Sequence, residues 1–122
     1  MEQSIQSHRG LKVWQKAMDL AEAVYRLAAA FPVTERYRLA SQITRAAASV
    51  PANIAEGNAR GTKRDYANFL AIAKGSLMET ETYLMLAVRL KFLEQEEAAP
   101  ALSLVVEISK MLTALRSRLL EG

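Results

Sequence analysis

Residues 39–57 of the chain have the sequence LASQITRAAASVPANIAEG, and this stretch decides the fold. Its apolar side chains recur every three or four residues, which is the spacing of one face of an α-helix. The predicted core face comprises Leu39, Ala40, Ile43, Ala46, Ala47, Val50 and Ile54. Pro51 lies within this pattern and lacks the backbone N–H that would bond to the carbonyl of Ala47. We therefore predict a helix that kinks or restarts near Pro51.

Three further segments show the same helical periodicity. They cover residues 11–30, residues 62–90 and the chain from about residue 94 onward, and no segment alternates with the two-residue period of a strand. Short connections between successive helices favour antiparallel neighbours. The sequence thus predicts an all-α fold, an antiparallel up-down-up-down four-helix bundle formed as a single domain by residues 11–122, after a flexible tail over residues 1–10.

The helix boundaries carry their own signals. Thr34 is a predicted N-terminal cap for the second helix, and Thr62 with Asp65 has the spacing of a capping box for the third. Residues 56–61 contain two of the five glycines, which indicates a helix stop followed by a tight connection.

Composition excludes several classes of protein. Hydrophobic residues make up 51% of the chain and charged residues 24%, which is typical of a folded globular domain. The chain has no cysteine, so disulfide scaffolds and cysteine-ligated metal sites are excluded. The single histidine, His8, lies in the predicted tail and leaves no base for a catalytic triad and no ligand pair for a di-iron site. We therefore predict no enzymatic activity, no catalytic residue, no metal site and no cofactor.

Membrane insertion and export are also not expected. The longest uncharged run, residues 46–55, is about half the length that a membrane-spanning helix requires. The N-terminus has neither the basic start nor the apolar stretch of a secretory signal. We predict a cytoplasmic protein with no membrane contact.

The positive charge is concentrated in the first half of the chain. The net charge is +3, but residues 1–64 carry ten Lys and Arg against five Asp and Glu, and the remaining residues carry six against eight. Clustered cations are typical of nucleic-acid binding, although a solvated surface is the simpler interpretation. The candidate nucleic-acid-binding residues are Arg36, Arg38, Arg45, Arg60, Lys63 and Arg64.

Two of these candidate sites have structural alternatives. Lys63 and Arg64 lie at the predicted start of the third helix, where free amides attract a phosphate, but the same residues also suit plain capping. Arg45 lies among alanines, and either an ion pair with Glu56 or a ligand contact would account for it.

The end of the third predicted helix is apolar almost all the way round. Residues 83–90 have the sequence YLMLAVRL, whereas an outer helix of a bundle needs only one covered stripe. We predict that part of this segment faces another copy of the chain, although internal packing altered by the prolines is the alternative. The predicted interface residues are Tyr83, Met85, Leu86 and Leu90.

Several motifs together suggest a family. They are LKVWQKA at 11–17, FP at 31–32, SQI at 41–43, RAAASVPANIAEG at 45–57, RG at 60–61 and FLAIAKGSL at 69–77. Across about residues 8–120 the chain resembles the four-helix-bundle proteins encoded within intervening sequences of bacterial 23S ribosomal RNA genes. The resemblance implies an antiparallel bundle that assembles as a homopentamer, with no established enzymatic activity. Pro100 departs from the family pattern near the start of the fourth helix.

A second likeness bears on partners. The accessory variability determinant of diversity-generating retroelements is similar in fold, and it is a basic pentamer that works with a reverse transcriptase and nucleic acid. The leading hypothesis is therefore a non-enzymatic helical oligomer that binds structured RNA, or DNA, through its phosphates. The alternative hypothesis is a protein-interaction scaffold for a nucleic-acid enzyme such as a reverse transcriptase.

Overall fold

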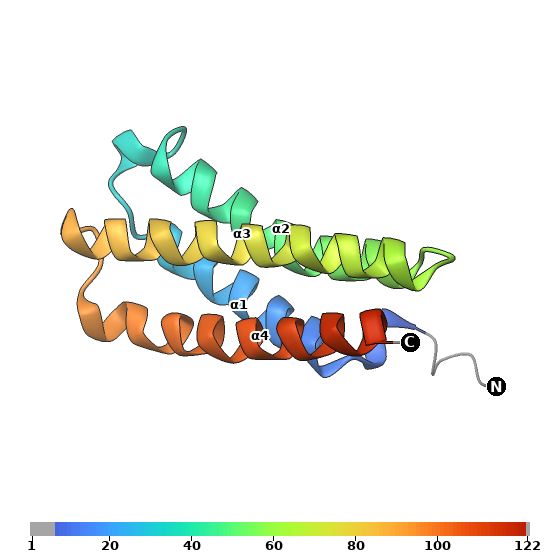
Figure 1. The fold of residues 1–122 in the computed structure, drawn as a ribbon. Helices are drawn as coiled ribbons and strands as arrows, with labels where there is room; N and C mark the ends of the chain where they lie inside the picture. The colour runs from blue at the N-terminus through green and yellow to red at the C-terminus, as the bar shows by residue number, and fades with distance from the viewer. Residues whose placement is uncertain (1–6, 122) are drawn as a thin grey trace.

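A computed structural model describes residues 7–121 and shows four long helices (Figure 1). Their bounds are α1 Lys12–Ala28, α2 Leu39–Asn58, α3 Lys63–Arg89 and α4 Gln95–Glu121, with short 3₁₀ turns η2 His8–Gly10 and η3 Val33–Glu35. Within the described residues there is no strand, and successive helices pack as neighbours. The predicted all-α antiparallel four-helix bundle is confirmed. Of the predicted tail, residues 1–6 lie outside the described residues. His8 packs on α1, with its ring centroid 4.9 Å from that of Trp14.

Helix α2 continues through its internal proline and does not restart there. Pro51 is buried inside a helix of 20 residues. In Figure 1 the teal first half of α2 slopes away from α3, whereas the green second half runs along it. The change of direction falls in the middle of the helix, where the missing proline N–H weakens the helical ladder.

The core is built from the apolar stripes that the periodicity predicts. Its fully buried large side chains come from all four helices: Leu20, Val24, Ile43, Val50, Ile54, Leu70, Leu77, Leu84, Val105, Ile108 and Leu112. One polar side chain lies among them, since Thr80 is fully buried. Its hydroxyl donates to the carbonyl of Ser76 at 2.8 Å, so the buried polar group is satisfied within its own helix.

In the connection from α1 to α2, Thr34 is not the N-terminal cap of α2 that the sequence predicts. Thr34 lies in η3, and α2 begins only at Leu39. The Glu35 carboxylate accepts the backbone N–H of Leu39 at 3.2 Å, so this carboxylate satisfies a free amide at the start of α2. The predicted cap was wrong because residues 33–35, which the helical pattern assigned to the start of α2, form the separate 3₁₀ turn η3 after Pro32.

The turn from α2 to α3 has both features that the sequence predicts, a helix stop within residues 56–61 and a cap at Thr62. Thr62 caps α3, and its hydroxyl accepts the backbone N–H of Asp65 at 3.1 Å. Helix α2 ends at Asn58, inside the predicted stop, and Gly57 lies buried in its last turn. A Cβ atom at this position would lie 2.8 Å from Cβ of Phe69 and 3.2 Å from the carbonyl oxygen of Tyr66. The glycine is therefore required for the close approach of α2 to α3.

Helix α4 is unbroken at Pro100. By length and composition alone it contains an 18-residue window that would pass as a membrane span, with a mean hydropathy of 1.4. In the bundle, its inner face packs against α1 and α3, and Lys16 Nζ on α1 lies 3.0 Å from the Glu107 carboxylate on α4. Only 28% of that window is buried in the bundle, and the absence of membrane contact stays a prediction.

Candidate nucleic-acid interface

The six candidate cations do not form one patch. Arg36 and Arg38 precede α2, whereas Arg60, Lys63 and Arg64 follow it. Because α2 has 20 residues and rises about 1.5 Å per residue, the length of this helix, about 30 Å, separates the two groups. The structure therefore divides the predicted site into a group at each end of α2, with Arg45 between them.

Arg60 is held by structural contacts. Its guanidinium lies 3.2 Å from the carboxylate of Glu56 and 4.0 Å from that of Asp65. It also lies over the ring of Phe69, 5.1 Å from the ring centroid. Two acids and an aromatic face thus satisfy this cation within the α2–α3 turn.

The ion pair predicted between Arg45 and Glu56 does not form, because Glu56 pairs with Arg60 instead. Glu56 and Arg60 are one helical turn apart, which is the spacing at which such pairs form. Arg45 is eleven positions before Glu56, a rise of about 16 Å along the helix. The predicted alternative of an Arg45–Glu56 pair is wrong.

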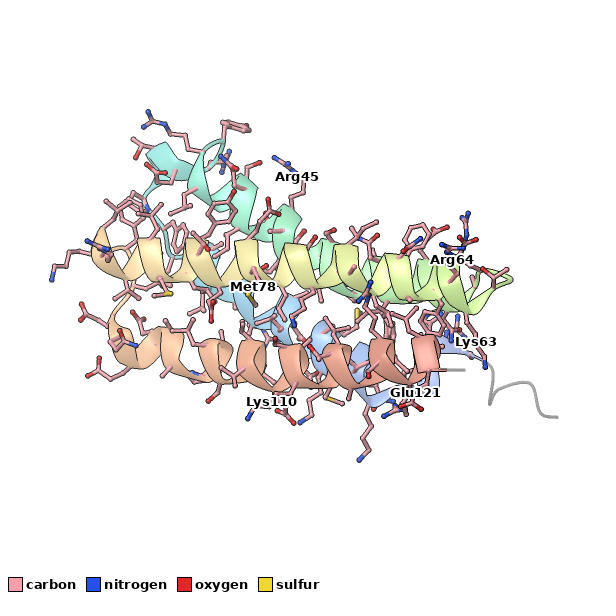
Figure 2. All side chains as sticks on the ribbon, viewed as in Figure 1. Arg45, Lys63, Arg64, Met78, Lys110 and Glu121 are labelled. Atoms are coloured by element: carbon pink, nitrogen blue, oxygen red, sulfur yellow. The ribbon has the colours of Figure 1, made fainter. Side chains whose placement is uncertain are left out.

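Lys63 and Arg64 occupy the first turn of α3. Both are exposed, and neither takes part in a salt bridge within the described part of the chain. Figure 2 shows both at the end of the bundle, by the α2–α3 turn. Thr62 satisfies only one of the free amides here, so the positive end of the helix dipole adds to the two side-chain charges. This arrangement favours a phosphate.

Arg36 and Arg38 come directly before the start of α2. The Arg38 side chain is 73% exposed and lies 3.8 Å from the Glu35 carboxylate, which is the outer limit of an ion pair. Arg36 is exposed, with its guanidinium 6.0 Å from the ring centroid of the neighbouring Tyr37. Neither contact neutralises the cation strongly, so both charges face solvent.

Arg45 lies on the outer side of α2, near its middle (Figure 2). It lines a small groove of about 190 Å³ where α2 slopes away from α3, opposite Glu79. Deeper in this seam, Ser76 Oγ donates to Ser49 Oγ at 2.9 Å, and Asn53 Nδ2 donates to the Ser49 carbonyl at 2.8 Å. Those hydrogen bonds are made without Arg45, whose guanidinium forms no salt bridge in the region from residue 7 to residue 121.

Sequence reasoning missed the aromatic side chains that lie beside the first group of cations. Tyr37 is 85% exposed and stands between Arg36 and Arg38 in the chain, and Tyr25 on α1 is 54% exposed. The Arg-Tyr-Arg pattern was a visible signal, since aromatics interleaved with cations are typical of nucleic-acid surfaces. Tyr25 carried no such signal, because it lies on the helical stripe that predicts a core position.

The apolar end of α3 is partly covered by its own chain. Tyr83 is half-buried and its hydroxyl donates to Gln42 Oε1 at 3.0 Å, which joins α3 to α2. Met85, Leu86 and Leu90 remain 53%, 40% and 49% exposed. We call these three residues the α3 apolar patch. The structure thus assigns Tyr83 an internal contact and leaves the α3 apolar patch uncovered by its own chain, and self-association there stays a prediction.

The fold and this surface define a class, the helical-bundle proteins with basic outer groups. Within that class, the chain belongs to the 23S rRNA-intervening sequence protein family, whose model matches residues 9–114. A similar solved structure is a protein of unknown function from the S23 ribosomal protein family of Bacteroides thetaiotaomicron. It is 28% identical, the match covers 85% of this chain and 97% of that chain, and the TM-score is 0.78. No curated protein matches the chain.

Proposed function

We propose that the protein is a non-enzymatic, cytoplasmic oligomer that binds the phosphates of structured RNA. The observation that carries the proposal is the pair Lys63 and Arg64, which lies exposed at the start of α3. Helix N-termini bind phosphate through free amides and the helix dipole, and each phosphate neutralised releases counterions. The membership of the 23S rRNA-intervening sequence protein family supports RNA as the nucleic acid.

Oligomerisation would strengthen these contacts. A single copy offers few cations, and each phosphate contact on its own is weak at physiological salt. A closed ring repeats the same cations in every copy, so contacts to one RNA add through avidity. The family resemblance implies five copies, and the α3 apolar patch supports self-association through its exposed surface.

The experiment is a fluorescence anisotropy titration of a labelled RNA hairpin at low salt. We expect Lys63→Ala combined with Arg64→Ala to weaken binding by about tenfold, because two phosphate contacts are lost. The matched control is Lys110→Ala combined with Arg118→Ala, which removes the same charge from exposed positions on α4. Equal weakening by both double variants would show that net charge alone matters and would contradict a phosphate site at α3.

Self-association is tested separately by light scattering. We expect the wild-type protein to have the mass of several copies and Leu86→Glu to lower that mass, since it places a charge in the α3 apolar patch. A matched change at an exposed polar position, Thr82→Glu, should leave the mass unchanged. A wild-type protein that stays a folded single chain would contradict the proposed oligomer.

The second candidate function is a scaffold for a nucleic-acid enzyme. The α3 apolar patch favours it as well, because exposed apolar side chains also suit a protein partner. Recovery of one protein after nuclease treatment, with no RNA binding by the isolated chain, would favour the scaffold over the RNA-binding protein.

A further inference from the structure

An open groove of about 550 Å³ lies between the end of α1 and the start of α2. Its lining includes Tyr25, Val33, Arg36 and Tyr37. Val33 and Tyr37 are 84% and 85% exposed, which makes them the most exposed large hydrophobic side chains of the described chain. We call this feature the tyrosine groove.

The two groove tyrosines differ from the tyrosines that serve the fold. Tyr66 and Tyr83 are half-buried, and their hydroxyl groups have hydrogen-bond partners in Asn58 and Gln42. Tyr25 and Tyr37 instead present most of their rings to solvent. Their rings are therefore available as flat apolar surfaces for a ligand.

The charges around the groove are those of a site for an anion. Arg36 lines it, and Arg38 is close by at the start of α2. The nearest acid in the chain, Glu35, is only 15% exposed at its side chain, and its carboxylate accepts the N–H of Leu39. On α1, Glu22 is paired with Arg26 at 2.6 Å. Glu35 and Glu22 thus each have partners, whereas Arg36 forms no salt bridge within residues 7–121 and Arg38 is 73% exposed despite its 3.8 Å contact with Glu35.

Exposed aromatic rings beside available cations match the chemistry of an unpaired nucleotide. Each base has a flat face that stacks on an aromatic ring, and each nucleotide carries one phosphate. A duplex offers its phosphates but hides its base faces within the stack. We propose that the tyrosine groove binds unpaired nucleotides of RNA, with bases stacked on Tyr25 and Tyr37 and phosphates held by Arg36 and Arg38. This inference rests on the proposed RNA-binding function and names the part of the RNA that this end of the bundle takes.

The test compares two labelled RNAs, a hairpin with an oligouridine loop and a fully paired duplex of the same stem. We expect the wild-type protein to bind the hairpin at least about fivefold more tightly than the duplex, the gain of one stacked base. Tyr37→Ala should lower this preference, since one of the two stacking rings is lost, while leaving duplex binding unchanged. Tyr37→Phe should retain the preference, because the ring is kept. Since Tyr37 is exposed, its removal leaves the core intact, and circular dichroism checks the fold.

The outcomes separate this inference from the proposed function. Equal binding of hairpin and duplex, with Lys63→Ala and Arg64→Ala weakening both, would overturn the tyrosine groove as a nucleotide site and keep the phosphate-binding protein. A hairpin preference that Tyr37→Ala does not alter would also overturn it. A lower mass of Tyr37→Ala in light scattering would show instead that the groove lies between copies of the chain. No binding of either RNA would overturn the proposed function itself.

Discussion

The two ends of α2 differ in how much of their chemistry the fold uses. At the α2–α3 end the connection has four residues, 59–62, and Gly57 allows Tyr66 and Phe69 to approach closely. At the α1–α2 end the connection has ten residues, 29–38, of which Phe31 is buried and most others are exposed. We call the α2–α3 connection, residues 59–62, the closed end, because the helices pack tightly beside it. We call the α1–α2 connection, residues 29–38, the open end, because Phe31 is its one buried residue.

The same contrast applies to the charged residues. Arg60 at the closed end is satisfied by Glu56, by Asp65 and by the face of Phe69. Arg36 and Arg38 at the open end have only weak contacts, and the aromatic ring between them faces solvent. A charged residue that stabilises the fold is thus distinguished from one available to a ligand by its partners, and not by its position in a basic stretch.

The largest expected effect tests the attachment point of the open end. Phe31 is 7% exposed, and its ring lies 5.6 Å from that of Phe92. Phe31→Ala should lower the free energy of unfolding by about 3–5 kcal/mol, because it removes a buried aromatic ring. Tyr37→Ala is the matched control and should change stability by less than about 0.5 kcal/mol. Urea denaturation measures both, and similar losses would contradict a single attachment point.

The next effect tests the closed end. Gly57→Ala should destabilise the protein by about 1–3 kcal/mol, since the new Cβ meets Phe69 and the Tyr66 carbonyl. Gly75→Ala in α3 is the control, because a Cβ there meets nothing within 4 Å. It should stabilise the protein by up to about 1 kcal/mol through helix propensity. Thermal unfolding of the two variants should move in opposite directions, and parallel shifts would contradict the close approach.

A smaller effect compares the caps at the two ends. Thr62→Ala removes the acceptor for the Asp65 N–H, and Glu35→Ala removes the acceptor for the Leu39 N–H. Each should cost about 1 kcal/mol of unfolding free energy. Chemical denaturation provides the measurement. If Glu35→Ala had no effect while Thr62→Ala did, the carboxylate at the open end would not be a cap.

The smallest effect concerns the cations at the closed end. Arg60→Ala should cost about 0.5–1 kcal/mol, a value limited by the 44% exposure of its side chain. Lys63→Ala combined with Arg64→Ala should leave stability unchanged within about 0.5 kcal/mol. Calorimetry on both proteins tests whether Arg60 is structural and the other two are not. A larger loss for the double variant would reverse this assignment.

Much of the fold was predictable from local pattern. The apolar stripe of residues 39–54 is confirmed, as is the cap at Thr62, because both signals depend only on neighbours in the sequence. The stripe predicted for α1 is wrong at Met18 and Tyr25, which are 45% and 54% exposed. The requirement for Gly57 was not predictable, because it comes from a contact with another helix. The start of α2 was also misplaced, because η3 satisfies its own backbone groups before the helix begins.

The candidate site was less predictable than the fold. Counting charges grouped Arg60 with Lys63 and Arg64, although only the first has partners within the turn. Exposure of Tyr25 was hidden, because its place on the helical stripe gives no sign that η3 and α2 leave it uncovered. Which cations and rings are available depends on the packing of the loops, which periodicity does not report.

Whether the exposed cations of this bundle bind phosphates is measured by the salt dependence of RNA binding. The affinity of the wild-type protein for the RNA hairpin is measured over a series of salt concentrations. We expect the logarithm of the binding constant to fall linearly with the logarithm of salt concentration, with a slope that grows by about 0.7–0.9 for each phosphate contacted. Binding that is independent of salt, or no binding at low salt, would contradict this expectation.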